Sequence, residues 1–329
     1  MLKIVFMGTP DFAQESLKRI YEEGYDIKAV VTNVDKPKGR GMKLIPSPVK
    51  VFANEKNLKV YQPEKVKNNK EFVEEIKKLE PDVICVVAYG KIIPKEILEI
   101  PKYGCINVHG SLLPKYRGAA PIQWAVINGD KETGITTMYM NEGMDTGDMI
   151  LKESVTIGEN ETTGELWDRL SKVGAELLVK TLKLIENGDT SREKQGDEYT
   201  LAPMLKKEMA RIDWQNSSAN QIKNLIRGLN PIMGAYSLLN GKKIKFWRAE
   251  VITEEELIKL FPEMQEYSYK LKNIEPGTVL FSDSKYGLYI KAKDGILKIT
   301  EIQGENAKKM NINDFLRGNE ISVGSIFAW

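Results

Sequence analysis

The chain contains a single histidine, His109, and the residues around it make it a candidate for catalysis. Asn107 lies two positions earlier, so on a strand both side chains would leave the same face. An amide N–H beside a protonated imidazole can stabilise an oxygen that gains negative charge, as in acyl transfer. A ring that titrates near neutral pH can also move a proton. The alternative is a strand-end histidine bonded to a neighbouring carbonyl.

The residues after His109 favour the catalytic interpretation. The run 110–114 reads Gly-Ser-Leu-Leu-Pro, which predicts that a strand ends here and opens into a loop. Open α/β sheets bind their ligands at the carboxyl ends of their strands. Tyr89 and Gly90 follow another apolar run, 83–88, and are candidates for the wall of the same pocket.

A catalytic imidazole usually needs an acidic partner that orients it. The loop 141–148 offers three candidates, Glu142, Asp145 and Asp148, and spacing alone does not separate them. Glycines at 143 and 147 give this loop the freedom to carry a carboxylate into a pocket. The alternative for Asp145 is a turn residue bonded to its own backbone.

Two basic segments are candidates for phosphate contacts. The loop 36–43 carries Arg40, Lys43 and two further lysines, and it is followed by Ser47 and Pro48, a typical N-cap and first helical residue. Lys206 and Lys207 form a second basic spot. A solvated surface loop is the alternative for both segments.

The sequence lacks the motifs that usually mark nucleotide, metal and disulfide sites. The turn 8–11 reads Gly-Thr-Pro-Asp, which is neither the dinucleotide fingerprint nor a P-loop. His, Cys and carboxylate residues do not cluster at metal-ligand spacing, so we expect chemistry without a metal. Cys85 and Cys105 lie in apolar runs without CxxC spacing and are expected to be buried thiols.

The N-terminal part has the alternation of a doubly wound, Rossmann-like α/β domain. Six expected strands span 3–7, 27–32, 83–88, 105–108, 134–140 and 149–156. Four expected helices span 11–23, 66–79, 121–128 and 162–187. Parallel pairing with crossover helices would bring the ends of the strands 83–88 and 105–108 to one sheet edge.

A second, smaller domain is expected after a polar, aperiodic stretch. One amphipathic helix at 219–229 precedes short alternating strands that favour a small, OB-like β-barrel. These strands are expected at 235–239, 243–252, 277–281, 287–291, 296–302 and 324–327. The predicted organisation is therefore a catalytic domain at 1–188, a linker at 189–205 and a barrel at 206–329.

Net charge is +2 but is unevenly distributed. Residues 206–329 carry 19 basic and 15 acidic side chains, whereas residues 1–205 carry 29 and 31. A positive barrel suits an anionic macromolecule. The apolar run at the N-terminus is too short for a signal peptide, and no run approaches the ~20 residues of a membrane span. We therefore expect a cytoplasmic protein without membrane contact.

The segment 107–122, together with Met144-Asp145-Thr146-Gly147, resembles the shared core of the formyltransferases that use 10-formyltetrahydrofolate. The resemblance extends over nearly the whole chain. It implies that Asn107, His109 and Asp145 form the catalytic trio. It also implies that the folate donor contacts a set of loop residues: Ser111, Leu112, Leu113, Pro114, Tyr89 and Gly90.

The resemblance also implies an acceptor. The loop 35–50 is similar to a tRNA-contacting insertion of the family, with Arg40 and Lys43 as its cations, and Lys207 matches a lysine placed near bound tRNA. The implied reaction moves the formyl group to the α-amine of methionine on initiator tRNA. We also expect a monomer. Two alternatives stay open: a formyltransferase for a small amine such as an amino sugar nucleotide, and a non-catalytic RNA-binding protein.

Overall fold

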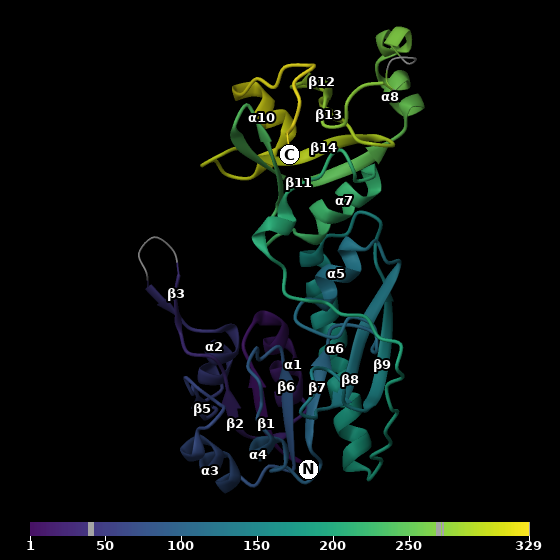
Figure 1. Cartoon of the computed structure of the whole chain (residues 1–329). Helices are drawn as coiled ribbons and strands as arrows, with labels where there is room; N and C mark the ends of the chain where they lie inside the picture. The colour runs from purple at the N-terminus through teal and green to yellow at the C-terminus, as the bar shows by residue number, and fades with distance from the viewer. Residues whose placement is uncertain (39–42, 268–270, 272, 329) are drawn as a thin grey trace. The chain divides into compact units, whose positions relative to one another are not determined.

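The computed structural model describes residues 1–38, 43–267, 271 and 273–328 (Figure 1). The chain divides into two compact units, each built from several segments. Unit 1 comprises Met1–Ile122, Glu132–Thr156 and Leu166–Pro203, and unit 2 comprises Gln123–Lys131, Ile157–Glu165 and Met204–Trp329.

Unit 1 contains a seven-stranded sheet in the order β5-β2-β1-β6-β7-β8-β9. The five strands from β5 to β7 run parallel, while β8 and β9 extend the sheet by antiparallel pairing. These strands are β1 (Lys3–Gly8), β2 (Asp26–Val31), β5 (Val60–Tyr61), β6 (Val83–Val87), β7 (Cys105–His109), β8 (Glu132–Tyr139) and β9 (Met149–Thr156).

Helices lie on both faces of this sheet. On one face Val5 and Met7 of β1 share a buried cluster with Phe72 of α3 (Lys70–Lys78) and Ile97 of α4 (Lys95–Leu98). On the other, α1 (Asp11–Glu22) lies beside α6 (Thr163–Glu186), where the Phe12 and Trp167 rings meet edge to face at 5.0 Å. Two layers of helices around a mostly parallel sheet confirm the Rossmann-like α/β prediction.

The periodic elements predicted for this unit are present, with shifted ends. The helix expected at 66–79 begins only at Lys70, where Asn69 caps it by accepting from the Phe72 N–H. Ser47 caps α2 (Pro48–Glu55), as its position before a proline predicted. The sequence did not indicate α4, the short β5, or the hairpin of β3 (Lys36–Lys38) and β4 (Lys43–Ile45), which stands out from the sheet in Figure 1.

Unit 2 contains a six-stranded antiparallel sheet in the order β10-β11-β14-β13-β12, with β15 paired to β14. Its strands are β10 (Ala235–Leu239), β11 (Lys242–Ile252), β12 (Val279–Asp283), β13 (Gly287–Lys291), β14 (Ile296–Gln303) and β15 (Met310–Asn311). Near the C-terminus, Ala328 bridges to Leu238 of β10 and Ile326 bridges to Thr278 beside β12. These bridges join the two edges of the sheet, in agreement with the predicted small barrel.

The barrel is filled by aromatic and aliphatic side chains. Trp214, Phe246 and Phe327 pack together with ring centroids 5.3 to 6.1 Å apart. The strand expected at 324–327 is wrong, since these residues make only isolated bridges. Helix α7 (Ala219–Gly228) was expected and begins with a capping box, whereas the helical segments that were not expected include α8 (Glu254–Leu260), η2 (Pro262–Tyr267) and α10 (Ile312–Gly318).

Both cysteines have the predicted state: Cys85 and Cys105 are free thiols, each buried. Burial raises the pKa of the Cys105 thiol to about 12. Within the described part of the chain, none of the helices combines the length and the apolar character that crossing a bilayer requires.

Candidate active site

Strand β7 presents the two polar side chains singled out by the sequence. Asn107 and His109 occupy alternate positions of β7 and therefore leave the same face of the sheet. The neighbouring residue, Val108, faces α6, where Gly174 lies against it. Since β6 and β7 pair in parallel, the ends of these two strands open at one edge of the sheet.

The His109 ring lies between two oxygen atoms. Its Nε2 is 2.9 Å from the backbone oxygen of Tyr116, and its Nδ1 is 3.7 Å from Oδ2 of Asp145. A carbonyl oxygen only accepts, so Nε2 carries the hydrogen of this bond. The ring is 5% exposed, which keeps this arrangement largely out of water. A doubly protonated imidazole finds an acceptor on each side.

Asp145 is the member of the acidic loop that reaches His109. Its Oδ2 also accepts a 2.8 Å hydrogen bond from the Gly118 N–H, and its backbone has a left-handed φ of 52°. Glu142 lies on the surface instead, with Oε1 3.6 Å from the ammonium of Lys95. Asp148 contributes its carbonyl oxygen to the Tyr139 N–H. The structure thus separates three carboxylates that spacing left equal.

The Ser-Leu-Leu-Pro segment is held against β8 by Thr136. The Thr136 hydroxyl donates to the Ser111 oxygen at 2.7 Å and accepts from the Leu113 N–H at 3.1 Å. Ser111 is fully buried, with its own hydroxyl donating to the Lys115 oxygen at 2.5 Å. Leu113 is buried against Met138 and Met149, while Leu112 and Pro114 are partly exposed.

Tyr89 and Gly90 lie directly beyond β6, at the edge where His109 also lies. Tyr89 is buried, and burial raises the pKa of its hydroxyl to about 12. Its carbonyl oxygen accepts from the Asn33 amide at 2.9 Å, which ties this turn to the end of β2. Gly90 has φ 76°, a conformation that favours glycine.

The basic candidates belong to other segments of the chain. Arg40 is outside the described residues. Lys43 is the first residue of β4. Lys207, in unit 2, begins the single-turn helix η1 (Lys207–Ala210) and is exposed.

The site includes backbone groups that no sequence pattern indicated. Tyr116 and Gly118 supply an oxygen and an N–H to the His109–Asp145 pair, and each has a positive φ. Backbone contacts leave no residue-type signal in a sequence. The predicted linker also contributes here, since Thr200 accepts from the Tyr116 N–H at 2.8 Å.

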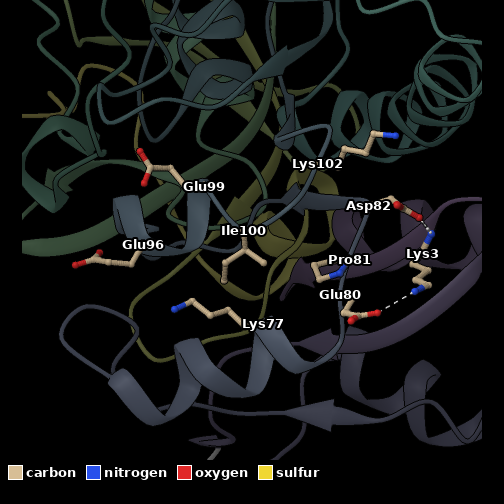
Figure 2. Close-up of a pocket in the computed structure, with 9 residues that line it drawn as sticks. All are labelled: Lys3, Lys77, Glu80, Pro81, Asp82, Glu96, Glu99, Ile100 and Lys102. Atoms are coloured by element: carbon tan, nitrogen blue, oxygen red, sulfur yellow. Dashed lines mark hydrogen bonds and ion pairs between the residues drawn. The ribbon is translucent and has the colours of Figure 1, made fainter.

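A separate hollow of about 640 Å³ lies at the opposite edge of the same sheet (Figure 2). Lys3 begins β1, and Pro81 and Asp82 directly precede β6, so the hollow lies at the amino ends of these strands. Lys3 makes two contacts within this lining: its ammonium is 3.3 Å from Glu80, and its backbone N–H donates to Asp82 at 2.8 Å. Its other lining residues are Lys77, Glu96, Glu99, Ile100 and Lys102.

A metal centre was not expected from the sequence. Among residues that the structure describes, none of the His, Cys, Asp and Glu side chains form a group of three or more able to hold an ion. The expectation of metal-free chemistry stays a prediction.

Comparison with known proteins identifies the class. Residues 2–182 match the formyl transferase family and residues 204–320 match the formyl transferase C-terminal domain. The chain belongs to the formyl transferase family. Its relatives include two methionyl-tRNA formyltransferases: that of Caldanaerobacter subterraneus, 53% identical over 99% of both chains, and that of Clostridioides difficile, 50% identical over 99% of this chain and 100% of the relative.

Solved structures share the fold at much lower identity. An N-formyltransferase from Helicobacter canadensis, solved with folinic acid and dTDP-3-aminofucose, has a TM-score of 0.64 at 20% identity, covering 94% of this chain and 100% of its own. HypX from Aquifex aeolicus, solved with tetrahydrofolic acid, has a TM-score of 0.61 at 17% identity and covers 99% of this chain and 51% of its own.

Proposed function

We propose that this chain transfers the formyl group of 10-formyltetrahydrofolate to the α-amine of methionine on initiator tRNA. The full-length relatives at 50% identity and above carry that acceptor in their names. The observation that carries the chemistry is the position of Asp145 beside His109, on the face of β7 that also presents Asn107.

In the proposed reaction the amine nitrogen attacks the formyl carbon, and the bond from this carbon to N10 breaks. Between the attack and the cleavage of the bond to N10, negative charge builds on the formyl oxygen. Asn107 donates a hydrogen bond to that oxygen, and His109, protonated and oriented by Asp145, stabilises it. N10 gains the proton that His109 supplies, and the amine nitrogen releases a proton, which returns the imidazole to its protonated form. For this transfer the ring has to exchange its contact with the Tyr116 oxygen for the substrate.

The folate donor is assigned to the loops at the ends of β6 and β7. Gly90, Leu112 and Pro114 are accessible and are offered as its direct contacts. Tyr89, Ser111 and Leu113 are buried, so they would contribute to the folate site by setting the shape of these loops.

We assign the tRNA to the basic residues Arg40, Lys43 and Lys207. The corresponding domains are the catalytic domain at 1–188, the linker at 189–205 and the barrel at 206–329. A charged tRNA as acceptor favours the cytoplasm as the site of action, and we expect a monomer.

An assay with three acceptors tests the proposal. The protein is given 10-formyltetrahydrofolate with methionyl initiator tRNA, methionyl elongator tRNA or free methionine, and formation of formylmethionine is measured. We expect turnover with the initiator tRNA and little with the other two. Equal use of free methionine would contradict the tRNA assignment and favour a small-amine acceptor. A protein that neither binds the folate nor transfers formyl would leave RNA binding as the function.

A further inference from the structure

The segment 193–202, here called the brace, contacts two loops of the candidate site. One loop contains Arg117 and the other contains Asp145. At one end Glu193 and Met149 exchange two backbone hydrogen bonds of 2.8 and 2.9 Å. At the other, the Arg117 N–H donates to the Thr200 oxygen at 2.9 Å and the Ala202 N–H donates to the Arg117 oxygen at 2.8 Å. The brace belongs to unit 1, although its composition predicted a linker.

Within the brace, the Gln195 carboxamide joins the two loops. Its Nε2 donates to the backbone oxygens of Asp145 and Gly147, each at 2.8 Å. Its Oε1 accepts from Nε of Arg117 at 2.9 Å. A carboxamide offers two N–H donors and an acceptor on one planar group. A carboxylate lacks the donors, and lysine and arginine lack the acceptor, so glutamine suits this junction.

The residue that Gln195 holds is under conformational strain. Asp145 has φ 52°, a left-handed conformation that non-glycine residues rarely adopt and that persists where their surroundings fix it. Two hydrogen bonds from one side chain hold the carbonyls of Asp145 and of Gly147, two residues on. The carboxylate of Asp145 is therefore aimed at His109 by a backbone that Gln195 fixes.

The brace also holds the opposite side of the imidazole. Thr200 accepts from the N–H of Tyr116, whose own oxygen contacts Nε2 of His109. The Arg117 guanidinium, which Gln195 binds, lies over the Tyr199 ring at 4.5 Å. Both oxygens that flank the His109 ring are thus connected to this one segment.

We propose that Gln195 is a positioning residue, which holds the Asp145 loop against the Arg117 loop so that the carboxylate stays aligned with His109. This inference rests on the proposed function and assigns part of the geometry of that site to the brace. Gln195 acts through Asp145 and does not itself touch the substrates.

The test compares Gln195→Ala with Gln215→Ala, a matched control at an exposed glutamine of unit 2. We measure kcat, KM for the folate donor and the pH profile of kcat, with thermal unfolding to verify folding. For Gln195→Ala we expect kcat to fall on the order of tenfold to a hundredfold, since misplacement by about 1 Å can cost that much. The KM for the donor should stay within about twofold, and the pH profile should change. Gln215→Ala should behave like the parent protein.

Gln195→Glu keeps the size of the side chain but places a carboxylate against two carbonyl oxygens. We expect a loss of kcat at least as large as that of the alanine variant. If Gln195→Ala does not fold, Gln195→Met, which fills the same space, is measured in its place. A folded variant with parental kcat and pH profile would overturn the proposal, as would failure of both variants to fold, because the role would then be structural.

A double variant separates this proposal from the proposed function. If Gln195 acts through Asp145, then adding Gln195→Ala to Asp145→Asn should slow turnover little further. Fully additive losses would contradict the positioning role while leaving the catalytic trio intact. Retained turnover in His109→Ala would instead contradict the proposed function itself.

Discussion

The two oxygens that flank the His109 ring give its charged form a contact on either side, and Asn107 lies on the same face of β7. A site built this way depends on each donor separately, because charge on the formyl oxygen is stabilised only by groups already in place.

We therefore expect Asn107→Ala and His109→Ala each to lower kcat on the order of a hundredfold or more, since one oxyanion donor is typically worth about 3 to 4 kcal/mol. Single-turnover rates with saturating donor and charged tRNA measure this. Losses below about tenfold in both variants would remove the pair from the chemistry. Folate binding, followed by titration, serves as the control for an intact site.

For single residues, the sequence indicated a role in the site only where the residue type alone suggests chemistry. A lone histidine two residues from an asparagine is visible in a sequence. The choice of Asp145 over Glu142 and Asp148 came from a family resemblance, since the turn that aims one carboxylate depends on tertiary contacts. Gln195 was missed because a polar residue in an aperiodic stretch resembles any linker residue.

The acidic loop depends on Gly147 for close packing. A Cβ at this position would run into the backbone oxygen of Tyr139, whereas a Cβ at Gly143 would meet mainly the Thr146 side chain, which can rotate. We expect Gly147→Ala to displace Asp145 and lower kcat roughly tenfold or more. Gly143→Ala is the matched control and should stay within about threefold. Similar kcat values for the two variants would contradict this account of the loop.

The base of the β3–β4 hairpin contains a polar cluster around Asp35. Its carboxylate accepts from Lys50 at 2.7 Å and from Gln62 at 2.8 Å, and these bonds lower the pKa of Asp35. The stabilisation is therefore present above the unfolded pKa of about 3.9 and is lost as pH falls through the lower folded value.

Asp35→Asn should reduce the free energy of unfolding near neutral pH by up to about 1 kcal/mol. The difference from the parent protein should shrink as pH falls below about 4, because the Asp35 carboxyl becomes protonated first in the unfolded chain and then, at lower pH, in the folded protein. Urea unfolding at a series of pH values measures this. A difference that stayed constant down to about pH 3 would show that the charge of Asp35 is not responsible.

Long periodic elements were predictable and short ones were not. Helix α6 has a leucine-rich face over 24 residues, and its ends were found to within one residue. The hairpin strands β3 and β4 have three residues each, too few for a period to emerge. The antiparallel pairing of β8 and β9 depends on which neighbours they meet, which periodicity along one strand does not reveal.

At the scale of the whole chain, composition separated an acidic N-terminal part from a basic C-terminal part. It could not show that unit 2 includes Gln123–Lys131 and Ile157–Glu165, since these segments join it through tertiary contacts. The basic C-terminal part is the feature that suits an anionic macromolecule as acceptor.

The proposed acceptor carries one phosphate per nucleotide, while the donor is a small molecule. We expect KM for charged tRNA to rise about tenfold or more between roughly 50 and 200 mM salt, because bound cations are released when lysine and arginine contact phosphates. KM for the folate donor should change far less. Parallel titrations with KCl measure both, and equal salt responses would argue against a basic tRNA-binding surface.

The assignment of the brace to unit 1 decides how hybrids of this enzyme family should be made. A chimera that exchanges the barrel at a junction near residue 188 would import a foreign partner for the Asp145 loop together with the new barrel. A junction after Pro203 keeps Gln195 and Thr200 with the loops they contact. Acceptor preference could then be exchanged between relatives without replacing the residues that contact the loops of the proposed catalytic site.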